Sequence, residues 1–202
     1  MPTDIEIDNA LKSTGMDKIK IDYARKTIRF MSSGAKIDLG SIAPGYAVDC
    51  AIYVLKESGV KNAMVNAGGE VFCMGRGPAG RAWKIGIQHP RLANKLLAKV
   101  RLQDRAISTS GDYEKFFFWR DKRISHIIDP RTGRPVSNMP ASVSITAPDC
   151  ITADALSTAI FVLGPKDGME VLKKMRCVEG MISVDENGNI KVYTTDGFFK
   201  KK

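Results

Sequence analysis

The pair Asp154 and Thr158, in the segment TADALSTA, offers the clearest chemistry in this sequence. Residues spaced i and i+4 share one face of a helix, and both of these side chains end in hard oxygen atoms. Mg²⁺ is bound through one or two protein carboxylates, while substrate phosphates and waters fill its remaining positions. The small residues around the pair favour a close approach by a ligand or by another element. The alternative is that Asp154 caps or pairs locally and that Thr158 faces solvent.

His126, in SHIIDPRTG, is one of only two histidines and lies between an apolar strand and a turn that contains Asp129. A histidine at such a place can act as a general acid or base, or hold a phosphate. The alternative, which a lone histidine ordinarily favours, is a structural side chain bonded to the backbone. His89, in QHPR, is interpreted as structural or surface. A further polar cluster, STSGDY, precedes the His126 segment and contains Thr109 and Tyr113.

Two glycine-containing segments could bring backbone groups close to a ligand. In NAGGEV the paired glycines stand between two apolar strands, and Asn66 and Glu70 flank them with hydrogen-bonding groups. The alternative is a tight turn. DLGSIAPGYAVD leads into a predicted helix, and helix N-termini favour anions. Taken alone, the second segment favours an ordinary turn from a strand into a helix.

Composition narrows the class of protein. The chain has 202 residues, of which 44% are apolar and 26% charged, as in soluble globular proteins. These proportions exclude collagen, a disulfide-dense miniprotein and a disordered tail. The longest apolar run is too short for a transmembrane helix, and the acidic N-terminus lacks the features of a secretory signal. The sequence as written is therefore expected in the cytoplasm, although a processed mature chain would look the same.

Charge and cysteine content narrow the class of protein further. The balance of 31 Lys+Arg against 22 Asp+Glu gives +9, but the basic residues are scattered and no nucleic-acid-binding signature is present. We expect no nucleic-acid partner, and interpret the charge as a solvated surface or an attraction for a small polyphosphate. The four cysteines contain no CxxC pair, which argues against a zinc site. Cys50 and Cys73 have apolar neighbours and are predicted to be buried.

The hydrophobic pattern predicts more strands than helices, without a regular βαβ alternation. We predict one domain over 1–202 of the α+β class, in which a mixed or antiparallel sheet is layered with helices. Alternation over 142–147 predicts a half-buried strand. Asn187–Gly188 predicts the turn of a final hairpin. Helices are predicted over 4–15, 43–58, 151–163 and 166–176.

In this order, the motifs resemble those of the ApbE family, the FAD:protein FMN transferases. The matching segments are DLGSIAPGYAVD, NAGGEV, WKIGIQHPR, STSGDYE, SHIIDPRTGRPV, SVSITAP and ADALSTAIFVLG. The resemblance implies an ApbE-like, T-fold-like architecture. It also implies a Mg²⁺-dependent transfer of FMN from FAD to a Thr or Ser hydroxyl of a target flavoprotein, with release of AMP. Family members are often exported and membrane-anchored, so an exported origin is the alternative to the cytoplasm.

The resemblance also implies roles for individual residues. Mg²⁺ would be held by Asp154, Thr158 and the carbonyl of Ala43. His126 and Asp154 would be catalytic, and we hypothesise that His126 assists deprotonation of the attacking hydroxyl. Asp129 would shape the loop beside His126. FAD would be bound by Asp49, Asn66, Gly68, Gly69, Glu70, Thr109, Tyr113 and His126.

Two departures from the family pattern accompany the resemblance. Pro44 stands where members usually have a lysine. The segment that forms about the first third of a typical member, and part of its FAD pocket, has no counterpart here, so a second copy in a homodimer or another partner is expected to complete the pocket. The alternatives to a transferase are an FAD pyrophosphatase, which forms FMN and AMP, and an FAD-binding module with reduced or absent catalysis.

Overall fold

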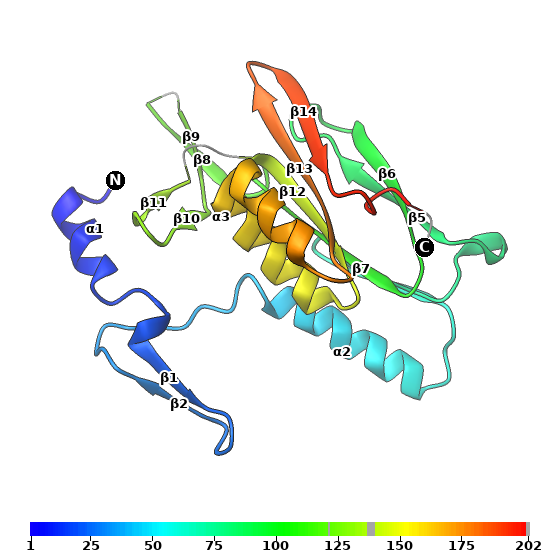
Figure 1. The fold of residues 1–202 in the computed structure, drawn as a ribbon, viewed down its shortest axis with the longest axis horizontal. Coiled ribbons are helices and arrows are strands. Elements are labelled where there is room, and N and C mark those ends of the chain that lie inside the picture. Colours follow the sequence, from blue (N-terminus) through cyan, green and yellow to red (C-terminus); the bar gives the residue numbers. More distant parts are fainter. Residues whose placement is uncertain (121, 137–139, 201–202) are drawn as a thin grey trace.

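The computed structural model describes residues 1–120, 122–136 and 140–200. Three α-helices lie within these ranges: α1 (Asp4–Leu11), α2 (Ala43–Glu57) and α3 (Cys150–Lys174). Two single 3₁₀ turns are formed by Met16–Lys18 and Pro78–Gly80. Short segments without helix or strand precede α1 and follow the last strand, and the two ends of the chain lie far apart (Figure 1).

Six strands form the main sheet in the order β14-β13-β12-β7-β4-β3, and every neighbouring pair is antiparallel. Their bounds are β3 (Ala63–Ala67), β4 (Glu70–Met74), β7 (Arg105–Gly111), β12 (Pro140–Ala147), β13 (Glu179–Glu186) and β14 (Asn189–Thr194). The α+β class is confirmed, and the main sheet is antiparallel rather than mixed.

Four hairpins lie outside the main sheet. They pair β1 (Ile19–Asp22) with β2 (Thr27–Phe30), β5 (Trp83–Gln88) with β6 (Leu96–Leu102), β8 (Phe116–Trp119) with β9 (Lys122–Ser125), and β10 (Ile128–Asp129) with β11 (Arg134–Pro135).

The two faces of the main sheet are covered by different elements. Phe72, Val143 and Ile182 face α2 and α3 and form one core with buried residues of these helices, such as Val48 and Phe161. The alternate residues face the β5–β6 hairpin, where Val71, Ile107 and Met181 pack with Ile87 and Val100. Figure 1 shows α2 and α3 on the same side of the sheet. The result is three layers: helices, sheet and hairpin.

The prediction that 142–147 is half-buried is wrong, because all of β12 is buried. The cause is that serine side chains of β12 form hydrogen bonds with polar side chains of the two neighbouring strands, β7 and β13, instead of with water. Ser144 Oγ lies 2.8 Å from Thr109 Oγ1, and Ser142 Oγ lies 2.7 Å from Ser183 Oγ. Hydroxyl pairs of this kind make an alternating strand compatible with a central position in the sheet.

The other predicted elements are largely confirmed. The final hairpin turns at Asn187 and Gly188, both with positive φ. The two predicted C-terminal helices form α3, which breaks at Gly164 (φ 79°, ψ 178°) just before Pro165. α1 ends at Leu11, earlier than predicted.

Of the two cysteines predicted to be buried, Cys73 is buried and Cys50 is exposed. The prediction for Cys50 is wrong because α2 buries the stripe formed by Gly45, Val48 and Ile52, and Cys50 lies on another face of the helix. In the described ranges, no helix is both long and apolar enough to cross a membrane.

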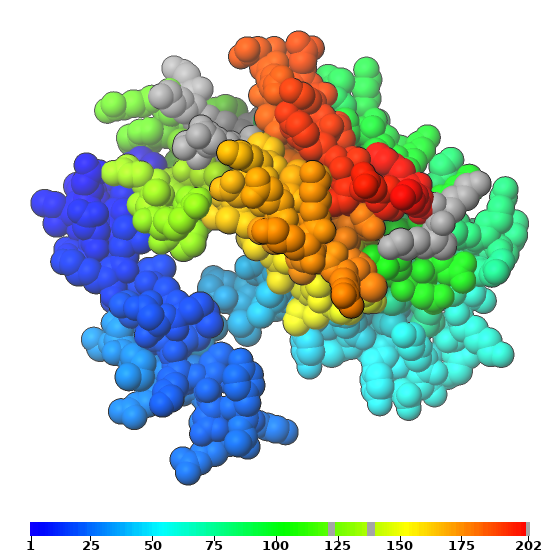
Figure 2. Space-filling view, in the orientation of Figure 1, coloured from blue at the N-terminus to red at the C-terminus, as the bar shows by residue number. Residues whose placement is uncertain are grey.

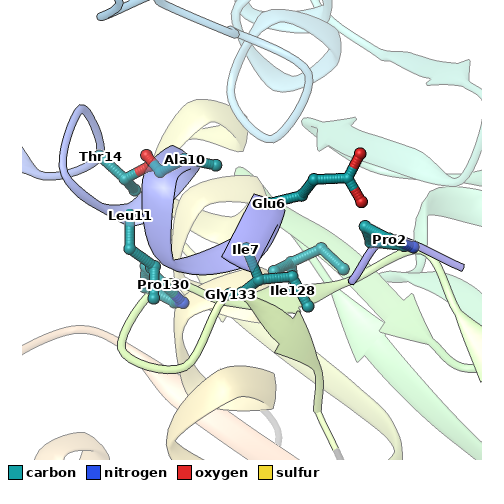
Figure 3. A pocket seen from close by; sticks show the side chains of 9 residues that line it. All are labelled: Pro2, Glu6, Ile7, Ala10, Leu11, Thr14, Ile128, Pro130 and Gly133. Atoms are coloured by element: carbon teal, nitrogen blue, oxygen red, sulfur yellow. The ribbon is translucent and has the colours of Figure 1, made fainter. Parts of the chain in front are cut away.

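The N-terminal residues stand apart from the layered body. Figure 2 shows them (blue) as a lobe beside the body, and Figure 1 shows the β1–β2 hairpin projecting away from the main sheet. α1 lies against the β10–β11 turn, where Ile7, Leu11, Ile128 and Pro130 line an apolar pocket of about 260 Å³ (Figure 3). Gly133 allows this approach, because a Cβ on it would lie 2.7 Å from Ile7 Cγ2.

Candidate functional site

Asp154 lies in the first turns of α3 and is 5% exposed. Its Oδ2 accepts a hydrogen bond of 2.8 Å from the backbone N–H of Gly45 in the first turn of α2. Burial raises the pKa of Asp154, and the bond from Gly45 opposes that rise. The structure therefore brings together two helix starts that are 109 residues apart in the sequence.

Gly45 makes this approach possible. A Cβ on Gly45 would lie 2.6 Å from the carbonyl oxygen of Cys150 and 2.8 Å from Cβ of Asp154. No side chain fits there, so glycine is required for contact between the helices rather than for its φ. Ala43, two residues before Gly45, is the first residue of α2 and stands beside the same junction.

Thr158 lies one helical turn after Asp154 and is half-buried against β7. Its Oγ1 is 3.2 Å from Oγ of Ser110, and Ser110 Oγ is 2.8 Å from Oγ of Ser157. Thr158 therefore faces the sheet side of α3, and the alternative in which it simply faces solvent is wrong. Neither Ser110 nor Ser157 is among the site residues predicted from the sequence.

Asp49 has a clear structural role. Its Oδ1 and Oδ2 accept the backbone N–H of Cys150 at 2.8 and 3.0 Å, and Oδ2 also accepts that of Ile151 at 2.9 Å. These are unpaired N–H groups of the α3 N-terminus, which a carboxylate stabilises. The Asp49 carboxylate thus caps the start of α3, and the assignment of Asp49 to FAD binding remains a prediction.

The turn between β3 and β4 contains the paired glycines. Gly68 and Gly69 have φ values of 75° and 117°, which side-chain-bearing residues rarely adopt. Asn66 Oδ1 accepts the N–H of Gly69 at 3.1 Å and closes the turn. The tight turn and the exposed backbone, which were alternatives on the sequence alone, therefore coexist.

A pocket of about 360 Å³ opens beside this turn, between the sheet and the β5–β6 hairpin. Asn66, Gly69, Thr109 and Tyr113 line it, together with Glu114. Four of the residues assigned to FAD thus share one cavity. Because side chains alternate along β7, Thr109 faces this pocket while Ser110 faces α3.

Glu70 and Glu114 connect the pocket electrostatically with Asp154. Burial raises the pKa of Glu70, and the charge of Asp154 adds to that rise. Burial also raises the pKa of Glu114 to about 7, with further contributions from Glu70 and Asp154. Three carboxylates that repel each other in this way make a region where a cation is favoured.

The donor set around Asp154 fits Mg²⁺. Asp154 offers a buried carboxylate and Thr158, one helical turn later, offers a hydroxyl; both are hard oxygens, and Glu70 and Glu114 interact electrostatically with Asp154. The carbonyl of Ala43 as a further ligand remains a prediction. Among the described residues, no group of three or more His, Cys, Asp or Glu side chains is arranged to hold a metal. A site with one carboxylate leaves coordination positions for phosphate oxygens and water, as Mg²⁺ requires.

His126 follows β9 and is exposed. Its Nδ1 lies 2.8 Å from the carbonyl oxygen of Lys115. A carbonyl only accepts, so Nδ1 carries the proton, and Nε2 is the basic nitrogen of the neutral ring. Lys115 directly follows Glu114, so this bond ties His126 to the segment that lines the pocket.

Asp129 shapes the turn after His126, in agreement with its expected role. Its carboxylate accepts the backbone N–H of Arg131 at 2.9 Å and also binds the Arg131 guanidinium. The bonds from Arg131 lower the pKa of Asp129. Its carbonyl accepts the N–H groups of Thr132 and Gly133, which completes the turn.

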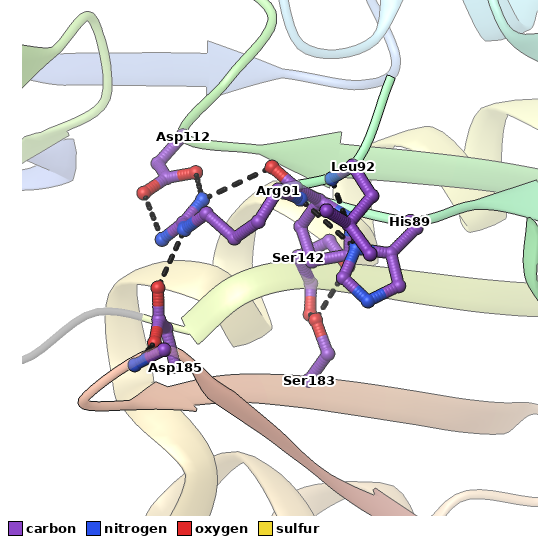
Figure 4. A network of polar contacts seen from close by, with 9 residues as sticks. His89, Arg91, Leu92, Asp112, Ser142, Ser183 and Asp185 are labelled. Atoms are coloured by element: carbon purple, nitrogen blue, oxygen red, sulfur yellow. Dashed lines mark hydrogen bonds and ion pairs between the residues drawn. The ribbon is translucent and has the colours of Figure 1, made fainter. Parts of the chain in front are cut away.

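His89 and Arg91 belong to a separate polar network (Figure 4). Nδ1 of His89 accepts the N–H groups of Arg91 and Leu92, both at 3.1 Å, which confirms His89 as structural. The Arg91 guanidinium makes two bonds to Asp112, at 2.6 and 2.8 Å, and one of 2.6 Å to Asp185. This network ties the β5–β6 loop to the end of β7 and to β13.

This network is not among the sequence-based predictions, although QHPR and STSGDY contain three of its members, His89, Arg91 and Asp112. The sequence separations of 21 and 94 residues carry no local signal of the pairing.

Fold and site together define an α+β protein with a pocket and an acidic, oxygen-rich site at one end of an antiparallel sheet. The family model described as the ApbE family matches residues 1–182. The chain belongs to the ApbE family.

Curated relatives and solved structures agree with this membership. A protein named FAD:protein FMN transferase from Vibrio cholerae is 35% identical over 199 residues, which are 98% of this chain and 59% of the relative. Its namesake from Haemophilus influenzae is 34% identical over 191 residues, 93% of this chain and 55% of the relative. The chain thus spans a little over half the length of these relatives.

Two solved structures have the same fold. That of the ApbE protein from Thermotoga maritima has a TM-score of 0.88 at 34% identity, covering 100% of this chain and 65% of that one. That of the flavin transferase ApbE from Vibrio cholerae has a TM-score of 0.86 at 33% identity, covering 98% of this chain and 62% of that one.

Proposed function

We propose that this chain takes part in Mg²⁺-dependent transfer of FMN from FAD to a Thr or Ser hydroxyl of a target flavoprotein, with release of AMP. One observation carries the proposal. The Asp154 carboxylate, the Thr158 hydroxyl and the α2 start lie together, and Glu70 and Glu114 link them electrostatically to the pocket that contains Asn66 and Thr109. The names of the relatives support the same reaction.

The reaction balances as a phosphoryl substitution. The target oxygen forms a bond to the FMN phosphorus, the bond between that phosphorus and the bridging oxygen breaks, and AMP leaves with the bridging oxygen. When bound, Mg²⁺ would neutralise charge on the diphosphate. Asp154, Thr158 and the carbonyl of Ala43 would hold it, and the N–H of Gly45 orients the Asp154 carboxylate.

The contact between His126 and the Lys115 carbonyl supports the expected role. Since Nδ1 donates to the Lys115 carbonyl, Nε2 is available as the base that accepts the proton of the target hydroxyl. In the pocket, Asn66, Gly69, Thr109 and Tyr113 would bind the flavin dinucleotide.

The test is incubation of the chain with FAD, Mg²⁺ and a target flavoprotein domain, followed by mass spectrometry of the domain. We expect a gain of FMN mass on the domain, abolished by Asp154→Ala and reduced by His126→Ala. His126→Ala that transfers at the parent rate across pH would refute the general-base role. Ser183→Ala is the control, because Ser183 lies on the face of the main sheet opposite to α3, which carries Asp154 and Thr158.

The other products of the same incubation identify the competing functions. FMN and AMP without labelling of the domain would show an FAD pyrophosphatase. Tight FAD binding without either product would show a binding module. Sedimentation with and without FAD tests the expectation that a second copy completes the pocket.

A further inference from the structure

A row of hydroxyl groups leads from the interior of the protein to Thr158. Ser157 on α3 is fully buried, and its Oγ donates a hydrogen bond of 2.9 Å to the backbone carbonyl of Asp154. Ser110 Oγ on β7 lies 2.8 Å from Ser157 Oγ, and Thr158 Oγ1 lies 3.2 Å from Ser110 Oγ. Buried hydroxyls require partners, and here the partners form a chain that ends at a proposed metal ligand.

The direction of every bond in this chain follows from one fixed end. A carbonyl oxygen only accepts, so the single proton of Ser157 points to Asp154. Ser157 Oγ therefore accepts a hydrogen bond from the Ser110 hydroxyl, so the single proton of Ser110 points to Ser157. Ser110 in turn accepts from Thr158. The Thr158 hydroxyl proton thus points toward Ser110 on β7, and the lone pairs of Thr158 Oγ1 point in other directions.

This direction matters for a cation. A hydroxyl binds a metal through an oxygen lone pair, and a proton pointing at the cation would oppose binding. We propose that Ser110 is a positioning residue that takes the Thr158 proton and so presents the Thr158 lone pairs to the cation held with Asp154. The proposal rests on the proposed function, in which Asp154 and Thr158 share Mg²⁺.

The first experiment measures metal affinity directly, with Mn²⁺ as the probe and electron paramagnetic resonance as the readout. Groups that orient metal ligands typically contribute about 10-fold or more to affinity. We expect Ser110→Ala to weaken Mn²⁺ binding roughly 10-fold, and Ser110→Thr, which keeps the hydroxyl, to restore most of it. Calorimetry with Mg²⁺ should give the same ranking.

The matched control is Ser183→Ala. Ser183 also has a buried hydroxyl partner, Ser142 at 2.7 Å, but the pair lies away from Thr158. Its removal should leave Mn²⁺ affinity at the wild-type value. A loss equal to that of Ser110→Ala would show that any buried serine matters through stability alone, and would overturn the proposal.

The second experiment needs no metal. Three-bond couplings to the Thr158 methyl group report whether its side chain occupies one rotamer. We expect a single rotamer in the wild type and averaging in Ser110→Ala at unchanged folding, measured on the apo protein. An unaveraged rotamer in Ser110→Ala would overturn the proposal even if affinity had fallen.

Asp154→Asn separates this proposal from the proposed function. If the wild type binds Mn²⁺, Asp154→Asn does not, and Ser110→Ala binds like the wild type, then only the role of Ser110 is wrong. If the wild type itself binds no Mn²⁺, the metal step of the proposed function fails, and the presentation of Thr158 to a cation fails with it.

Discussion

At the scale of the residue, Asp154 is held where its charged form is disfavoured. Burial raises its pKa above the ordinary value of 3.8, so the folded state binds the proton more tightly than the unfolded state. Its ionisation therefore destabilises the fold increasingly as the pH rises from about 4 through the raised pKa. The N–H of Gly45 offsets part of this penalty, and a bound cation would offset more of it.

Asp154→Asn tests this argument. Without metal, we expect the variant to unfold at a higher temperature than the wild type at pH 8, because an amide oxygen still accepts the Gly45 N–H. The difference should shrink toward pH 4. Mg²⁺ at 100 times its Kd should stabilise the wild type by about 2.7 kcal/mol and leave the variant unchanged. Scanning calorimetry from pH 4 to 8 measures both effects, and a less stable variant at pH 8 would contradict the argument.

At the scale of the element, Asp49 couples two helices. It lies on α2, and its carboxylate satisfies N–H groups at the start of α3, 101 and 102 residues later. Asp49→Ala should cost about 0.5–2 kcal/mol of unfolding free energy, the range for loss of a helix cap. Urea denaturation measures it. The matched control is Asp38→Ala, because Asp38 also accepts a backbone N–H, that of Gly40, but in an exposed local turn. Equal losses would refute the coupling of α2 to α3.

The same two helices show what the sequence could and could not predict. Their existence follows from local patterns: Pro44 at the start of α2, and Gly164–Pro165 at the break of α3. The contact between Gly45 and Asp154 follows from no local pattern, because it depends on a tertiary approach between residues far apart in the chain. The Asp154–Thr158 pair could be read from its helical spacing, whereas Ser110 could not, since its role depends on which face of β7 meets α3.

At the scale of the whole molecule, the β1–β2 hairpin projects away from the main sheet (Figure 1). Its register pairs Ile19 with Phe30 and Ile21 with Ile28, so these four side chains share one face. Yet Ile28 and Phe30 are 50% and 48% exposed. A two-stranded hairpin is marginally stable unless its apolar face is covered.

Hydrogen exchange measures this difference in stability. We expect the amides that pair β1 with β2 to exchange by local opening, far faster than those that pair β12 with β13 in the buried sheet. The β5–β6 hairpin is the internal control, because it also has two strands but packs on the main sheet. Equal protection of β1–β2 and β12–β13 would contradict this view of the molecule.

Strand β7 serves both sides of the candidate site, since Thr109 faces the pocket and Ser110 faces α3. This arrangement has a consequence for how the protein can evolve. Point substitutions at alternate positions can change the pocket and the region around Thr158 independently of each other. Loss or gain of a single residue within β7 would instead exchange the two sets of side chains and damage both functions at once. Within this family, length variation should therefore be tolerated in the loops around β7 and excluded from the strand itself.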